Sequence, residues 1–362
     1  MSASKFCLLE RGKRATDYTD YTDAIRLNPI RVIRVIRGSP PPYFARRHSC
    51  LFNRASHKLR TMLKTFTALM LAACVAQTAA PLHDAFDGRQ AYAYTAQVAG
   101  FGERPPGSSG HQKTRDLIHQ VLKKNGAQIE TDDFTATTPR GRVEVHNIIG
   151  KFNVGSDPNQ PIIILGGHYD TLFKKGFIGA NDGASSTAIL LAFADALNGK
   201  KTKMQIWLMW TDLEEAIEDF VGDDGLYGSR HFAQKLKQDG RASRVRGFFL
   251  LDMIGDKNLG VCLEEVSTRS LQDSIAAAAK ELGYTKYFFQ YRCNIIDDHK
   301  SFLDAGIPAV DVVDAEFGRM GQQFDGMGEF HHANTDTMDK VSRDSLQIVG
   351  RTMLRTVTLL DK

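Results

Sequence analysis

The sequence has few cysteines, and none of them stands in the Cys-x-x-Cys spacing of a structural zinc site. Three of the five precede residue 81, which leaves Cys262 and Cys293 for the rest of the chain. Two cysteines permit one disulfide in an oxidising compartment, and the sequence leaves open whether they pair. Any metal site must therefore use histidine, aspartate and glutamate.

The sequence also lacks a strong charge imbalance. Its formal net charge is +4, and many of its arginines and lysines lie in residues 1–61. A balance this small gives no reason to expect a nucleic-acid partner. With 42% hydrophobic and 24% charged residues among 362, the composition is typical of a globular protein with a sizeable core. No long linker rich in proline or serine follows Pro81, so residues 81–362 are predicted to form one domain.

Residues 1–61 show no pattern of a packed core. They contain the tandem repeats TDYTDYTDA and RVIRVIRG, and low complexity of this kind argues against folding. Residues 62–80, MLKTFTALMLAACVAQTAA, have the form of a secretory signal peptide. Their apolar stretch is shorter than the about 20 residues that span a bilayer. We expect translation to begin at Met62, so that residues 1–61 are a mis-assigned start or a disordered extension.

The signal segment contains LAAC, Leu71–Cys74, which resembles a bacterial lipobox and would make Cys74 a lipidated N-terminus. A plain cleaved signal peptide is the alternative. Both readings predict an exported protein, which is periplasmic, secreted or a membrane-anchored lipoprotein. A lipid on Cys74 would be its membrane contact.

The rest of the chain alternates two kinds of segment. Short, nearly continuous apolar runs are typical of buried parallel strands: PIIILGG, KMQIWLMW and RGFFLLDMIG. Segments with helical spacing separate them: STAILLAFADALNG, GSRHFAQKLKQDG and TRSLQDSIAAAAKELG. This alternation predicts an α/β fold with a largely parallel central sheet. In such sheets ligands bind at the carboxyl ends of the strands.

Acids and histidines follow nearly every predicted strand. They are His168, Asp170 and Asp182 around the first run, Glu214 and Glu215, Asp252, then Asp297, Asp298 and His299, and finally His331 and His332. Each group alone has a structural explanation. A His-x-Asp after a strand is often a turn, a Glu pair often a solvated helix start, and a late His pair often a surface feature. Their recurrence at equivalent positions predicts a functional site.

Together these motifs resemble the zinc-dependent exopeptidases of metallopeptidase clan MH, which include bacterial aminopeptidases and glutaminyl cyclases. The matching segments are GGHYDT, GANDGASS, EEA, LYGSRHFA, LLDMIGD, DDHKSFL and HHANTDTMDKV. The similarity runs from about Arg104 to near the end of the chain. It implies a mixed, largely parallel central sheet of about eight strands, with helices on both faces.

The resemblance also implies a zinc site. One zinc would be held by Asp182, Glu215 and His332, three protein ligands that leave a fourth position for water or substrate. His332 is preferred to His331 because the family motif places its histidine four residues before the Asp-Thr pair. Aminopeptidases of the clan add a second zinc, here on His168 and Asp252 with Asp182 as the bridge. The sequence permits one zinc or two.

The remaining motif residues match roles in catalysis. Glu214 corresponds to the family's general base, beside the metal without binding it. Asp170 is expected to orient His168. The substrates implied are the N-termini of peptides or proteins. Two reactions fit: an aminopeptidase would hydrolyse the first peptide bond, whereas a glutaminyl cyclase would close an N-terminal glutamine to pyroglutamate and release ammonia.

Several features favour the cyclase branch. AIEDFVGDDG separates the Glu pair from LYGSRHFA, as in glutaminyl cyclases, and Asp252 and Asp297 match two acids that form a hydrogen-bonded relay with the base. Three positions depart from the animal cyclases. Phe220 and His331 stand where tryptophans are expected, and Asp311 where a histidine is. Peptide hydrolysis therefore stays open. A metal-free binding protein on the same fold is a third reading, which the intact ligand set disfavours.

Overall fold

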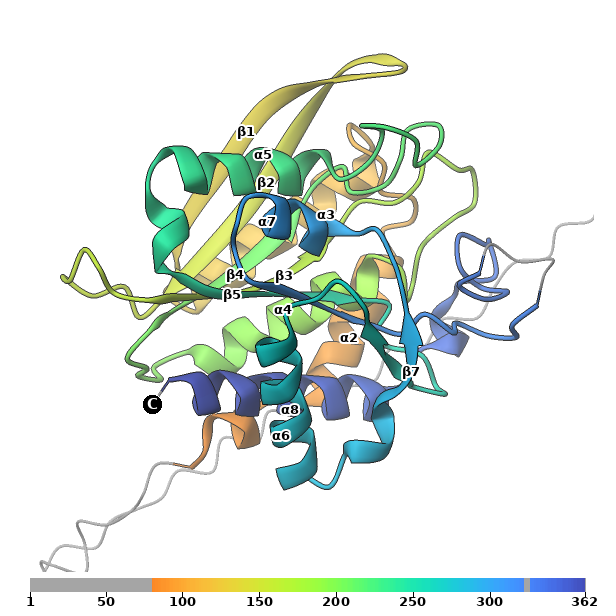
Figure 1. The fold of residues 1–362 in the computed structure, drawn as a ribbon. Coiled ribbons are helices and arrows are strands. Elements are labelled where there is room, and N and C mark those ends of the chain that lie inside the picture. The colour runs from red at the N-terminus through yellow and green to blue at the C-terminus, as the bar shows by residue number, and fades with distance from the viewer. Residues whose placement is uncertain (1–79, 322–325, 362) are drawn as a thin grey trace, which may run out of the picture. The chain divides into compact units, whose positions relative to one another are not determined.

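A twisted sheet forms the centre of the protein (Figure 1). The computed structural model describes residues 80–321 and 326–361, which belong to one compact unit. The predictions for residues 1–61, the signal segment and Cys74 concern residues outside that description. No helix among the described residues is both long and apolar enough to cross a membrane.

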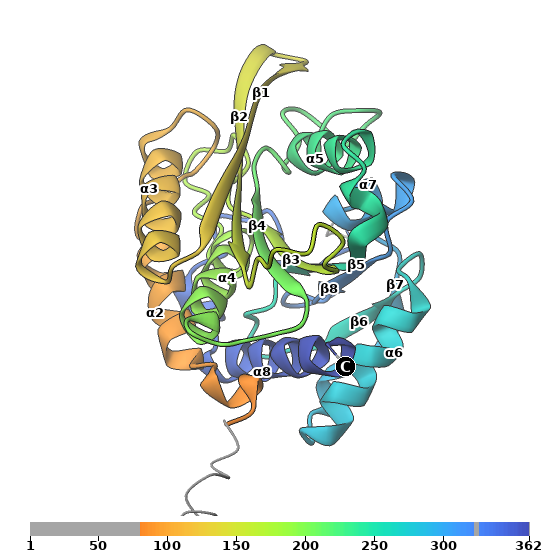
Figure 2. The ribbon, with the colours of Figure 1, turned by 90° about the vertical axis from the view of Figure 1, so that its left-hand side faces the viewer.

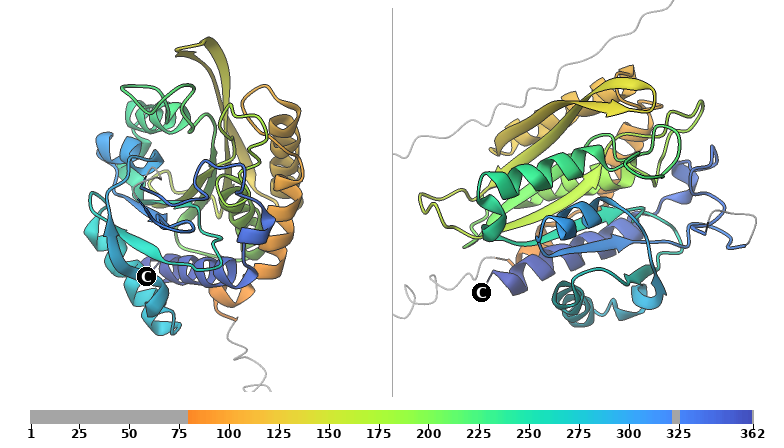
Figure 3. Two further views of the ribbon diagram at one scale, coloured as in Figure 1. Left: turned by 90° about the vertical axis from the view of Figure 1, so that its right-hand side faces the viewer. Right: turned by 45° about the horizontal axis from the view of Figure 1, so that its top comes forward.

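The sheet is mixed but mainly parallel. Its strand order is β1-β2-β4-β3-β5-β8. The β1–β2 hairpin pairs antiparallel with β4, and the pairs β4/β3, β3/β5 and β5/β8 are parallel. The strands are β1 (Gln128–Thr138), β2 (Gly141–Phe152), β3 (Ile162–His168), β4 (Gln205–Thr211), β5 (Val245–Asp252), β6 (Val261–Glu264), β7 (Phe288–Cys293) and β8 (Ala309–Val313). Figure 3 shows the hairpin reaching beyond the other strands.

The predicted sheet of about eight strands is wrong in its count. Eight strands occur in residues 80–321 and 326–361, but six of them form the central sheet, and β6 and β7 pair only with each other. A disulfide between Cys262 and Cys293, with Cα atoms 5.9 Å apart, joins these two strands. The apolar runs in the sequence mark strands, but they do not say which sheet each strand joins.

Helices cover both faces of the sheet (Figure 2). They are α2 (Gly88–Ala99), α3 (Ser109–Lys124), α4 (Ala184–Leu197), α5 (Tyr227–Gln238), α6 (Arg269–Glu281), α7 (Asp298–Asp304) and α8 (Arg343–Leu360). Short 3₁₀ turns are η1 (Leu82–Ala85), η2 (Arg241–Arg244), η3 (Thr285–Tyr287) and η4 (Met338–Lys340). Two large hydrophobic cores pack against the sheet. Helices α2, α3, α4, α6 and α8 contribute to one core, and helices α5 and α7 contribute to the second.

Side chains of each central strand alternate between the two cores. On β3, Ile163 and Leu165 pack with α4, whereas Ile162 and Ile164 pack towards α5 and α7. All seven residues of β3 and of β4 are buried, which explains why they read as continuous apolar runs. The polar residues that follow these strands therefore emerge at the same edge of the sheet.

Candidate metal centre and active site

Asp182 lies in a turn that the protein holds by its backbone. The buried guanidinium of Arg104 donates to the carbonyls of Ile178, Gly179 and Asp182, at 2.5, 3.0 and 3.4 Å. From the other side, the carboxylate of Asp336 accepts from the amides of Asn181 and Asp182, at 2.8 and 3.0 Å. These contacts fix the backbone from which the Asp182 carboxylate projects.

Gly183 follows Asp182 and lets the chain turn into α4. Its φ is +82°, and a Cβ there would lie 2.7 Å from the carbonyl oxygen of Asp170 and 3.1 Å from Cε1 of His168. Any other residue would combine backbone strain with a clash against the end of β3. The second glycine of the GANDGASS motif, Gly183, is therefore required for steric reasons.

Asp170 connects the end of β3 to the glutamate pair. Its carboxylate accepts from the amides of Glu214 and Glu215, at 3.2 and 3.3 Å, and lies 3.6 Å from Nδ1 of His168. Among the described residues His168 Nδ1 has no hydrogen-bond partner, so the orienting role of Asp170 stays a prediction, whereas its contacts to the two amides position the backbone of both glutamates. Sequence reasoning missed this second contact because its donors are backbone amides.

The potential zinc ligands converge as the sequence predicts. His332 Nε2 lies 3.2 Å from Glu215 Oε2 and 3.6 Å from Asp182 Oδ2. His168 Nε2 lies 3.2 Å from both Asp182 Oδ1 and Asp252 Oδ1. Ligands about 2.0–2.1 Å from a tetrahedral zinc lie about 3.3 Å from one another. Among the described residues, two groups have ligand atoms within 4.8 Å of one another: His168, Asp182 and Glu215, and Asp182, His331 and His332. The cluster could therefore hold a metal ion, but these groups combine its residues differently from the two predicted zinc sites.

Unsatisfied carboxylate oxygens support a cation at this position. Asp182 Oδ2 and both carboxylate oxygens of Glu215 are buried and accept no hydrogen bond from the residues described here. Buried carboxylates normally find hydrogen-bond donors or a metal. The donor set of two carboxylates and an imidazole nitrogen suits zinc. The residues present therefore fit this metal.

Crowding of acids shifts the pKa values around the cluster. Burial and the charge of Asp297 raise the pKa of Glu214 well above its usual range, and burial and Asp252 do the same for Asp297. Burial lowers the pKa of His168, but the neighbouring carboxylates, led by Asp252, outweigh burial and raise it. The site concentrates negative charge, which a bound cation would relieve.

The three predicted catalytic acids lie around one cavity of about 100 Å³. Glu214, Asp252 and Asp297 all line it, together with Ile295, Ile296 and other residues: Asp182, Glu215, Phe220, Met327, His331 and His332. No hydrogen bond joins the carboxyl group of Glu214 to Asp252 or Asp297 in the described part of the chain. The three acids are therefore neighbours around the cavity, and the hydrogen-bonded relay stays a prediction.

The departures from the animal cyclases fall in two places. Phe220 and His331 both line the cavity, and the ring of His331 stacks on that of His332 at 3.7 Å. Asp311 lies on β8, buried, with Oδ2 3.6 Å from Nδ1 of the buried His299. Two of the three differences therefore bear directly on the shape of the cavity.

With this geometry in place, comparison with known proteins identifies the family. Residues 147–357 match the family model described as peptidase family M28. The chain belongs to peptidase family M28. The match spans more than half of the 362 residues and includes all the predicted metal ligands and catalytic acids. The predicted relationship to zinc exopeptidases and glutaminyl cyclases is confirmed.

Individual M28 relatives include enzymes of known structure. The chain is 37% identical to a glutaminyl cyclase of an Acidobacteriales bacterium, with a TM-score of 0.72, covering 76% of this chain and 95% of that one. It is 26% identical to a Zn-dependent exopeptidase of Parabacteroides distasonis, with a TM-score of 0.65, covering 74% and 97%. It is also 27% identical to the glutaminyl-peptide cyclotransferase of Drosophila melanogaster, covering 68% and 75%.

Proposed function

We propose that this M28 enzyme is a zinc-dependent glutaminyl cyclase, which converts an N-terminal glutamine of a peptide to pyroglutamate and releases ammonia. The observation that carries the proposal is the 37% identity to the Acidobacteriales glutaminyl cyclase over 76% of the chain. The acids around a small cavity support it. The substrate would be the N-terminus of a peptide or protein.

Zinc would be held by Asp182, Glu215 and His332, and when bound it would supply a Lewis acid for the γ-amide carbonyl of the substrate glutamine. Glu214 takes a proton from the α-amine, whose nitrogen forms a bond to the carbonyl carbon of the side-chain amide, Cδ. The bond from that carbon to the amide nitrogen breaks, and Glu214 returns the proton to the departing ammonia. Asp252 and Asp297 line the same cavity as Glu214.

The cavity fits a single side chain. Phe220, Ile295 and Ile296 supply apolar surface beside the acids, and such surface excludes water from a reaction in which water must not attack. The small volume of about 100 Å³ favours an enclosed N-terminal residue, with the rest of the peptide outside.

Peptide hydrolysis is the second candidate, and one observation favours it. His168 Nε2 and Asp252 Oδ1 lie 3.2 Å apart beside Asp182, so a second zinc could bind as in aminopeptidases of the clan. A metal-free binding protein is disfavoured, because without a metal the buried carboxylate oxygens of Asp182 and Glu215 would stay unsatisfied.

Paired substrates separate the two reactions. The purified enzyme is offered a Gln-peptide and a Leu-peptide of otherwise equal sequence, and ammonia and free amino acid are both measured. A cyclase releases ammonia from the first, leaves the second intact and contains about one zinc per chain. Free leucine together with two zinc ions per chain would establish the aminopeptidase instead.

We also propose that the enzyme is exported. The signal-like residues 62–80 support export, and the disulfide between Cys262 and Cys293 is of a kind that persists in oxidising compartments. A lipid on Cys74 would anchor it to a membrane. Mass spectrometry of the native N-terminus tests both points, and any peptide that includes a residue before Met62 contradicts the proposed start.

A further inference from the structure

A groove of about 460 Å³ adjoins the active-site cavity. Its walls come from the end of β7, from the segment that leads to Asp297, and from residues that follow β8. Ile295, Ile296 and Met327 line both the groove and the cavity around Glu214. The two spaces therefore meet at these three side chains.

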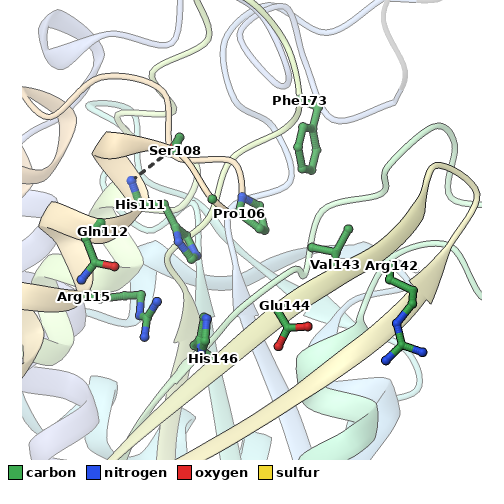
Figure 4. A pocket seen from close by; sticks show the side chains of 11 residues that line it. Pro106, Ser108, His111, Gln112, Arg115, Arg142, Val143, Glu144, His146 and Phe173 are labelled. Atoms are coloured by element: carbon green, nitrogen blue, oxygen red, sulfur yellow. Dashed lines mark hydrogen bonds between the residues drawn. The ribbon is translucent and has the colours of Figure 1, made fainter.

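A cleft between α3 and β2 has no such connection to the active site (Figure 4). Its volume is also about 460 Å³, but it shares no lining residue with the active-site cavity. Figure 4 shows Arg115 and Arg142 at opposite ends of this cleft. Of these two spaces, the groove is the one that adjoins the place where the first residue of a substrate would bind.

The walls of the groove are mainly apolar. Four of the side chains that line it are half-buried and pack on the small core that includes Phe317: Tyr291, Cys293, Ile295 and Met327. The part of each that stays accessible belongs to the groove. Apolar surface left open in a concave site favours an apolar ligand.

The charged side chains of the groove do not favour an ion. Arg292 and Glu316 are both exposed, they have opposite charges, and they are the charged side chains among the described residues that line the groove. Nη1 of Arg292 also lies 3.8 Å from Oε1 of Glu265. The groove therefore suits an uncharged side chain better than a carboxylate or an ammonium group.

One wall of the groove is held in place from behind. The hydroxyl of Tyr291 accepts from the amide of Ala315 at 3.0 Å and donates to Asp314 Oδ1 at 3.3 Å. Cys293 is bonded to Cys262. A wall that is already fixed in this way loses little conformational entropy when a ligand binds.

Exposed apolar side chains gather where the cavity and the groove open to solvent. Phe220 lines the cavity, Met320 lines the groove and Ile296 lines both, and their exposed fractions are 43%, 45% and 69%. Single exposed apolar side chains are common, whereas a group of them around connected openings indicates a binding surface. This surface begins beside the catalytic acids.

We propose that the groove binds an apolar side chain of the substrate peptide, from one of the two residues that follow the N-terminal glutamine. The inference rests on the proposed cyclase function. Neighbouring Cα atoms in a peptide are about 3.8 Å apart, so these two residues are the nearest to a first residue held in the cavity. The enzyme would then prefer peptides that carry a large apolar residue at position two or three.

The first experiment measures kcat/KM for ammonia release from glutaminyl tetrapeptides that carry leucine, asparagine or alanine at position two or at position three. Asparagine has nearly the shape of leucine but is polar, so it separates apolar burial from size. We expect leucine at one of the two positions to raise kcat/KM about ten-fold over both alternatives, because an open groove buries part of the side chain. Equal turnover of all these peptides would overturn the proposal.

Two variants locate the preference in the groove. Met320→Gln and Ile296→Asn should each reduce the ratio of leucine to alanine turnover to about two-fold or less, since each removes apolar contact surface. Val266→Gln is the matched control, because Val266 is 44% exposed and lies outside both spaces; it should keep the ratio. All three positions are exposed, so the variants are expected to fold. A leucine preference that survives in both groove variants would contradict the proposal.

A binding measurement separates this inference from the cyclase function. The Glu214→Gln variant is titrated with the same leucine and alanine peptides by calorimetry, which needs no turnover. Tighter binding of the leucine peptide, lost when Met320→Gln is added, supports the groove even if no peptide releases ammonia, a result that would refute the cyclase proposal alone. Equal affinities, or no binding of either peptide, would overturn the groove as a substrate site.

Discussion

Three residues of the active site have backbone conformations that L side chains rarely adopt. Leu213 before Glu214, Met253 after Asp252, and the predicted ligand His332 have φ values of 53°, 47° and 53°. Each such conformation costs about 1–3 kcal/mol and persists only where its surroundings enforce it. These conformations lower stability at positions that orient Glu214, Asp252 and His332. Such a cost is expected of a preorganised site.

Replacing Glu214 by glutamine tests the role of the general base. The amide keeps the size of the side chain but cannot accept the proton, so kcat should fall about 10²- to 10⁴-fold. Zinc content, measured by elemental analysis, should not change because Glu214 is not among the predicted ligands. Glu218→Gln, on the exposed part of the same loop, is the matched control and should keep full turnover. Unchanged turnover in Glu214→Gln would remove this residue from the mechanism.

The sequence predicted candidate metal ligands but not the residues that hold them in place. His168, Asp182, Glu214 and Glu215 could be predicted because they follow buried strands, where ligands gather in parallel sheets. Arg104 received no role, because its partners are carbonyl oxygens of a loop about 75 residues further along the chain. Contacts between a side chain and a distant backbone leave no spacing pattern in a sequence.

At the scale of elements, a buried carboxylate joins the β1–β2 hairpin to α5. Asp132 on β1 accepts from Lys235 at 2.8 Å, from Asn147 at 3.0 Å, and lies 2.9 Å from Nδ1 of His231. Burial raises the pKa of Asp132, but these partners outweigh burial and lower it below its usual range. The attachment of the hairpin to α5 thus depends on this buried polar network.

Asp132→Asn should lower the free energy of unfolding by about 2 kcal/mol at neutral pH, since it removes a buried carboxylate that pairs with Lys235 and accepts a hydrogen bond from Asn147. Because folding lowers the pKa of Asp132, its contribution is complete above the unfolded pKa of about 3.9 and declines as the pH falls through the lower folded value. Urea unfolding of wild type and variant should therefore converge in acid. Asp133→Asn, at a more exposed ion pair, should cost at most about 1 kcal/mol; an equal loss from both variants would contradict this account.

The order of the strands was less predictable than their existence. The runs that became β3 and β4 are buried along their whole length, and β5 is buried except at Arg246 and Asp252, so all three are mainly apolar. After its buried first residue, β7 alternates between half-buried and exposed residues, and it pairs with β6 outside the central sheet. Pairing of this kind depends on contacts between distant segments, which explains why a count of strands did not give the size of the sheet.

At the scale of the whole molecule, one disulfide fixes the segment that completes the active site. Cys293 ends β7, and the chain then passes through Ile295 and Ile296 to Asp297, all of which line the cavity. The partner of Cys293, Cys262, lies 31 residues earlier on β6. The cross-link therefore restrains both the fold and one wall of the cavity.

The double variant Cys262→Ser, Cys293→Ser should lower the free energy of unfolding by about 3–4 kcal/mol, the chain-entropy value for a loop of this length. Urea denaturation of the oxidised wild type and the variant measures the difference. Reducing the wild type should reproduce the loss, and the variant itself should not respond to the reductant. Equal stability of oxidised wild type and variant would show that the disulfide contributes nothing to the folded protein.

The central claim is that the enzyme closes a glutamine side chain without adding water. The intact mass of a Gln-peptide after incubation with the zinc-loaded enzyme tests it most directly. The account predicts one product, lighter than the substrate by the mass of one ammonia, with every peptide bond intact. Two products, free glutamine and a peptide shortened by one residue, whose summed mass exceeds the substrate by one water, would contradict it.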